Sequence, residues 1–155
     1  VCFTMVSDST GQWFGDYNYN NESTIDSVMF NVTTNSTNQV RAWDDFVGGY
    51  TYVLTLIEPM NSKVGLNNFT LLLHQTNNDK VFTEVNGAGM FIRPWMPSHG
   101  HGSSNNTNPA SLGNGRYSGK ANFTMSGGWE VYDSIYYNGG TITKSPHPKF
   151  VFDVY

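Results

Sequence analysis

The feature that most constrains the fold is a strict alternation of residue types between Tyr117 and Met125. The apolar or small residues of this segment are Tyr117, Gly119, Ala121, Phe123 and Met125, and one polar residue separates each of them from the next. Because successive side chains of an extended strand point to opposite faces, a period of two gathers the apolar set on one face. The alternation predicts a half-buried β-strand with one apolar and one solvated face.

Five further segments have a strand-like pattern and are bounded by clusters of Gly, Pro, Asn or Ser. They are residues 50–57, 69–74, 88–93, 129–137 and 150–155. The composition agrees, because aromatic residues make up 15% of the chain while Ala, Leu, Glu and Lys are few. A chain of 155 residues is long enough to bury a hydrophobic core. The sequence therefore predicts an all-β sandwich of about seven strands.

Residues 94–115 lack a periodic apolar pattern and are rich in Gly and Pro. This composition predicts one long connection rather than strands. Connections longer than about 12 residues within a compact domain are usually functional or disordered. The segment is therefore the first place to look for a site.

The connection contains three metal-binding side chains within six residues, namely Met96, His99 and His101. A thioether sulfur is soft and prefers Cu(I), whereas imidazole accepts Cu(I), Cu(II) and zinc. No Asp or Glu lies between Glu84 and Glu130, which argues against calcium or magnesium. The three donors therefore predict a copper site.

Three neighbouring residues complete this prediction. Met125 ends the alternating strand on its apolar face and is a possible fourth ligand, with core packing as the competing interpretation. Trp95 and Trp129 are expected to shield the ion from solvent or to lie against it.

Other classes of function have little support in the sequence. The net charge is −4 and no run of Lys or Arg occurs, so we expect no nucleic-acid partner. No apolar run approaches the roughly 18 residues of a membrane span. No local signature of a nucleophile with its base, or of paired catalytic carboxylates, is present, so we expect a protein that is not an enzyme.

The beginning of the chain repeats landmarks of its end in the same order. Phe3-Thr4-Met5, Gly11-Gln12-Trp13 and Met29-Phe30-Asn31-Val32 correspond to Phe123-Thr124-Met125, Gly128-Trp129 and Val151-Phe152-Asp153-Val154. This order predicts that residues 1–40 are the C-terminal part of a preceding repeat and that residues 41–155 form a complete domain. The partial repeat would add strands to an edge of this domain or of a second copy, so a homodimer formed by strand exchange is possible.

Several of these motifs resemble the YtkA-like family, which is related to FixH-type proteins. The resemblance covers about residues 48–155 and is carried by segments 94–102, 113–117 and 123–129. It implies an immunoglobulin-like β-sandwich outside the cytoplasm, frequently near copper handling or cytochrome oxidase assembly. It points to Met96, His99, His101 and Met125. His99 stands where many relatives have a methionine, which leaves room for Cu(II).

The leading functional hypothesis is a periplasmic or cell-surface module that holds copper or exchanges it with a donor or acceptor protein. A lipid anchor is one way in which the hypothesis attaches the module to the surface. The alternative is a non-catalytic surface module that binds protein or glycan through aromatic residues of its sandwich, such as Trp43, Tyr136 and Tyr137. A third hypothesis is a structural spacer built from repeated domains.

Overall fold

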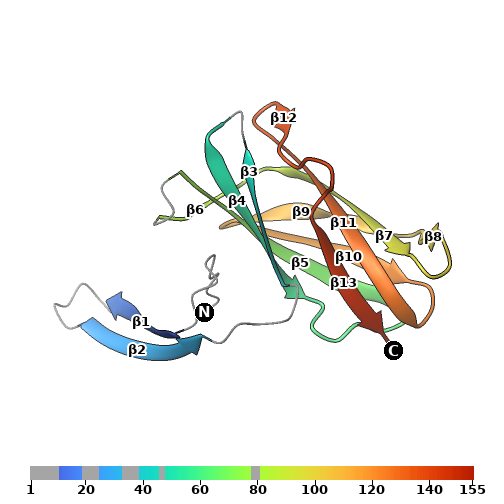
Figure 1. Ribbon diagram of the computed structural model, residues 1–155, viewed down its shortest axis with the longest axis horizontal. Helices are drawn as coiled ribbons and strands as arrows, with labels where there is room; N and C mark the ends of the chain where they lie inside the picture. Colours follow the sequence, from blue (N-terminus) through green and yellow to red (C-terminus); the bar gives the residue numbers. More distant parts are fainter. Residues whose placement is uncertain (1–10, 19–24, 33–38, 46–47, 78–80) are drawn as a thin grey trace. The chain divides into compact units, whose positions relative to one another are not determined.

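The computed structural model describes residues 11–18, 25–32, 39–45, 48–77 and 81–155, and the regular structure in these ranges is entirely β-strand (Figure 1). Within the same ranges no helix could cross a membrane. The predicted all-β class is confirmed.

The strands belong to two compact units. In the first unit, β1 (Gly11–Asn18) pairs antiparallel with β2 (Ile25–Val32). The strands of the second unit are β3 (Val40–Asp45), β4 (Tyr50–Glu58), β5 (Gly65–Thr76), β6 (Thr83–Glu84), β7 (Gly89–Met96), β8 (His101–Gly102), β9 (Thr107–Gly113), β10 (Arg116–Phe123), β11 (Gly127–Tyr137), β12 (Gly140–Thr141) and β13 (Lys149–Val154).

The second unit is a sandwich of two antiparallel sheets, as the sequence predicts (Figure 1). One sheet has the strand order β3-β4-β5-β10-β9, and β6 pairs with β5. The other has the order β12-β11-β7-β8, and β13 pairs with β11. The connection between β10 and β11 therefore links the two sheets.

The inner faces of both sheets form one hydrophobic core. Tyr117, Ala121 and Phe123 of β10 are fully buried, so the alternation distinguishes the inner from the outer face as far as Phe123. Trp129 and Val131 of β11 face them from the other sheet and are also fully buried. Each large apolar side chain buried in this way contributes about 1.5–3 kcal/mol to folding. The expectation that Met125 ends this strand on its apolar face was wrong, because β10 ends at Phe123 and Met125 is 38% exposed.

Hydrogen bonds from side chains to the backbone close the sandwich. The hydroxyl of Tyr117 donates to the carbonyl of Val85 at 2.8 Å and accepts from the amide of Ala88 at 3.0 Å, so it holds the segment that enters β7. On the opposite side, the indole of Trp43 donates to the carbonyl of Ile142 at 2.8 Å. Such bonds satisfy backbone groups that lie beyond the sheet ladders.

The expectation of one long connection over residues 94–115 was wrong. β7 continues to Met96, β8 follows after a tight turn, and β9 occupies most of the remaining segment. The sequence gives little sign of β9 because Pro109 is its one buried residue, so it has no apolar period. A proline is tolerated there because β9 is an edge strand.

The first unit and the end of the second share one backbone feature. Trp13 pairs with Phe30 and Gly11 with Val32, while Trp129 pairs with Phe152 and Gly127 with Val154. The two antiparallel strand pairs, β1–β2 and β11–β13, thus have the same register at the positions that the predicted repeat aligns. The boundaries 1–40 and 41–155 stay a prediction, and the Phe3-Thr4-Met5 landmark lies outside the described residues.

Candidate metal site

The candidate site begins at the turn between β7 and β8. The carbonyl of Met96 accepts hydrogen bonds from the amides of His99, at 3.2 Å, and Gly100, at 2.9 Å. Pro97 occupies the second position of this turn, where its fixed φ is favourable. Gly100 has φ 65°, a left-handed conformation that glycine adopts without steric cost. The Pro-Ser-His-Gly sequence therefore encodes a tight turn, and it returns the chain beside the end of β7.

The turn brings Met96 and His101 together. They are directly paired across the β7–β8 ladder, so their side chains lie on the same face of the sheet. Met96 is only 2% exposed and belongs to the core, whereas His101 is half-buried. A thioether and an imidazole thus lie side by side at the rim of the sandwich.

A hydrogen bond selects the tautomer of the neutral His101 ring. Its Nδ1 lies 3.0 Å from the carbonyl oxygen of Gly102. Because a carbonyl oxygen only accepts, this contact places the proton of the neutral ring on Nδ1 and leaves the lone pair of Nε2 free. Histidines that bind metals generally donate their other ring N–H in this way. His101 is therefore prepared to bind through Nε2.

The second imidazole lies within reach of the first. The ring centroids of His99 and His101 are 5.9 Å apart, with an interplanar angle of 55°. With metal–nitrogen bonds of about 2 Å, two imidazoles bound to one ion have centroids separated by about 5–6 Å. The spacing of the two rings therefore fits a shared ion.

The site also includes residues from the β10–β11 connection, which contains Met125, and from the start of β11, which contains Trp129. The ring of His101 meets the Trp129 indole edge-on, with a centroid separation of 5.9 Å and an angle of 74°. The indole nitrogen of Trp129 donates to the carbonyl of Met125 at 3.0 Å, which fixes the β10–β11 connection. Met125 is 38% exposed, so it is less buried than a core methionine. Figure 1 shows β8 and the start of β11 at the same end of the sandwich.

Gly127 lies beside the candidate site, although the sequence analysis does not single it out. A Cβ atom placed on it would lie 2.7 Å from Cε of Met96, so the thioether methyl group would have to move to make room for a side chain. Gly127 also has φ 123°, which other residues rarely adopt. The Gly127-Gly128 pair after Met125 is visible in the sequence, but only the structure shows what the first glycine contacts.

The site is built from neutral groups. Residues 94–115 and 121–129 contain no Asp, Glu, Lys or Arg. In the part of the chain that the structure describes, no group of three His, Cys, Asp or Glu side chains could hold a metal ion. An ion at this rim would thus need methionine sulfur in addition to the two imidazoles.

The structure does not bring every predicted residue to this cluster. Trp95 lies on the outer face of its sheet, opposite Glu130, and its ring is 5.7 Å from the guanidinium carbon of Arg93. Met96 and Trp95 point to opposite faces because they are adjacent in a strand. Met96, His99, His101 and Trp129 do gather at one rim, and the backbone of Met125 joins them.

No curated protein and no solved structure matches this chain. A family model described as YtkA-like matches residues 45–132, which is more than half of the sequence. The match spans the whole rim, from the end of β7 to the start of β11. The chain therefore belongs to the YtkA-like family.

Proposed function

We propose that this chain is a non-catalytic, extracytoplasmic module that binds copper through Met96, His99 and His101, with Met125 as a possible fourth ligand. The ion is its cargo, which it holds or exchanges with a donor or acceptor protein. The observation that carries the proposal is the position of His101: it is paired with Met96, adjacent to His99 and in contact with Trp129.

The chemistry of the donors favours copper over other metals. Calcium and magnesium require oxygen ligands, and residues 94–115 and 121–129 contain no carboxylate side chain. Structural zinc sites usually have four His or Cys ligands, and among the described residues only two such side chains meet here. A thioether beside two imidazoles suits copper in both of its common oxidation states. Neutral donors in a partly buried position favour the ion of lower charge, because they do not compensate a second positive charge.

A titration of the metal-free protein tests this proposal. Cu(I) and Cu(II) are titrated in competition with chromophoric chelators, and the His99→Ala/His101→Ala double variant is compared with the unaltered chain. We expect the Cu(I) affinity to fall by more than about tenfold, equivalent to about 1.4 kcal/mol.

His147→Ala is the matched control, because His147 lies by Ser134 rather than at the rim. It should bind copper as the unaltered protein does. An unchanged affinity in the double variant would refute the assignment of the ligands.

The second candidate function is binding of protein or glycan at the outer face of a sheet. The structure places the three aromatic residues named for this function in different surroundings. Tyr136 is exposed on that face, but Tyr137 packs against the core, and Trp43 stacks on Tyr52 with a centroid separation of 5.9 Å. The three aromatic residues named from the sequence therefore do not form one exposed platform.

A further inference from the structure

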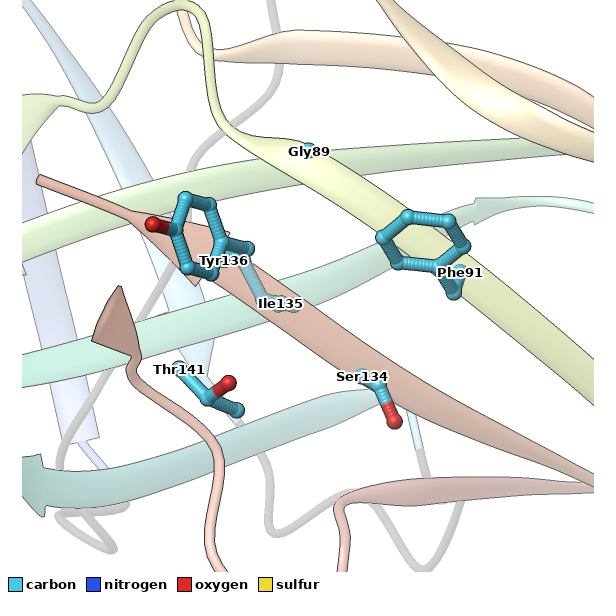
Figure 2. A pocket seen from close by; sticks show the side chains of 6 residues that line it. All are labelled: Gly89, Phe91, Ser134, Ile135, Tyr136 and Thr141. Atoms are coloured by element: carbon cyan, nitrogen blue, oxygen red, sulfur yellow. The ribbon is translucent and has the colours of Figure 1, made fainter. Parts of the chain in front are cut away.

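A shallow hollow lies on the outer face of the sheet formed by β7, β11 and β12 (Figure 2). None of the residues that line it belongs to the candidate metal site. The lining residues are Gly89, Phe91, Ser134, Ile135, Tyr136 and Thr141. None of them carries a charge.

The register of the strands explains why the surface is hollowed here. Gly89 pairs with Tyr136, and Phe91 pairs with Ser134, so each aromatic residue faces a small one. A Cβ atom on Gly89 would lie 3.8 Å from Cβ of Tyr136 and 3.9 Å from Cε2 of Phe91. The missing side chain of Gly89 therefore leaves open the space between the two rings.

The hollow combines exposed aromatic rings with hydroxyl groups. Phe91 is 57% exposed and Tyr136 is 49% exposed, high values for aromatic side chains on a sheet. Figure 2 shows the two rings in one row and the side chains of Ser134 and Thr141 in a second row. Diagonal neighbours on a sheet, such as Phe91 and Tyr136, are about 7–8 Å apart. This distance is comparable to the width of one six-membered sugar ring with its substituents.

The hydroxyl groups are available to a ligand. Those of Tyr136 and Thr141 form no hydrogen bond with any residue that the structure describes, and Ser134 has only a long contact of 3.5 Å to Nδ1 of His147. The hollow itself is almost entirely apolar, and these three hydroxyls, which can donate and accept, belong to residues that line it.

We propose that this hollow binds a neutral pyranose sugar. The C–H face of such a ring would lie against Phe91 and Tyr136, and its hydroxyls would bond to Ser134 and Thr141. A charged ligand would find no counter-charge among the lining residues, and an apolar peptide side chain would make no use of the hydroxyls, which would stay in contact with water. Ligand sites of this kind typically combine apolar walls with a few polar groups.

A titration followed by two-dimensional NMR tests this inference. The probes are the methyl glycosides of glucose, galactose and N-acetylglucosamine, which are added singly to the full chain. We expect at least one of them to shift the amide signals of Gly89, Phe91, Ser134 and Tyr136, with a dissociation constant in the millimolar range, as is usual for so small a ligand.

Three variants localise the binding. Phe91→Ala and Tyr136→Ala each remove one ring and should weaken binding by more than about fivefold. Gly89→Ala fills the hollow at ordinary contact distances, so it should reduce binding without disturbing the fold. Val151→Ala is the control, because Val151 is 46% exposed on the same sheet and does not line the hollow; it should bind as the unaltered chain does.

Two results would overturn the inference. One is the absence of any shift of these amides with all three glycosides at tens of millimolar. The other is a shift caused by N-acetyl-leucinamide but by no sugar, which would identify an apolar peptide as the occupant. Copper titration of Phe91→Ala should give the unaltered affinity, so failure of the sugar site and failure of the metal site are distinguishable.

Discussion

Asp133 is fully buried on the inner face of β11, between Val131 and Ile135. Neither oxygen of its carboxyl group has a hydrogen-bond partner among the described residues. Burial raises the pKa of Asp133 well above its ordinary value of 3.8, and the positive charge of Arg41 on β3 only partly opposes this. The carboxyl group is therefore held in its protonated form over a wider pH range in the folded chain than in the unfolded chain.

The Asp133→Asn variant should show by how much the buried carboxyl group lowers the free energy of unfolding at neutral pH. Because the folded-state pKa is raised, the stabilisation linked to Asp133 is fully present below pH 3.8 and is lost as the pH rises through the folded-state pKa. At pH 7 the variant, which carries no ionisable group there, should be more stable than the unaltered protein by at least about 1 kcal/mol. Chemical denaturation between pH 4 and 8 measures this difference, and a difference that stays constant with pH would contradict it.

Gly127 and Gly128 offer two neighbouring substitutions at the metal rim, of which only that of Gly127 falls on a residue with positive φ. Gly127→Ala should displace the Met96 thioether and weaken Cu(I) binding several-fold, because its new Cβ would overlap Cε of Met96. Gly128→Ala should leave the affinity unchanged, since no atom lies within 4 Å of a Cβ at that position. Chelator competition on both variants measures the effect. Equal affinities would contradict this prediction and count against Met96 as a ligand.

At the scale of elements, the β7–β8 hairpin holds three of the four proposed ligands. Gly100→Ala places a side chain on a residue with φ 65°, which costs about 1–2 kcal/mol and should open the turn. We expect both a lower melting temperature and weaker copper binding. Gly49→Ala is the control, because Gly49 has φ 68° in the β3–β4 turn and should lower the melting temperature alone. Loss of copper affinity in both variants would point to general destabilisation instead.

The elements that the sequence predicts well are those with one buried face. The alternation around Tyr117 predicts β10 because the burial of its side chains alternates in the same way. β9 has no such alternation, and the short strand β8 is defined by its pairing with β7 rather than by its composition. Local pattern thus identifies central strands, whereas β8 and β9 bury too few side chains to produce an apolar period.

The candidate site was predictable to a similar degree. The spacing of Met96, His99 and His101 predicts that these side chains lie close together, since a tight turn brings them together locally. It did not show that Trp95 would face away, because that follows from the continuation of β7 through Met96. The place of Gly127 beside Met96 depends on the packing of two segments about 30 residues apart, for which the sequence has no local signal.

At the scale of the whole molecule, the β1–β2 hairpin and the sandwich form separate compact units. A chain that lacks residues 1–38 should therefore unfold at the same temperature as the full chain and bind copper equally well. Differential scanning calorimetry and sedimentation velocity measure the outcome. A lower melting temperature would show that the hairpin supports the sandwich. A full chain that is dimeric, beside a monomeric truncated chain, would show strand exchange.

The β10–β11 connection passes from one sheet to the other, and Met125 lies on it, whereas Met96 and His101 belong to the second sheet. A single ion bound by all three residues would cross-link the two sheets at one end of the sandwich. Release of the ion and separation of the sheets at this end would then be coupled, so a partner that separates the sheets there would also promote transfer of the metal.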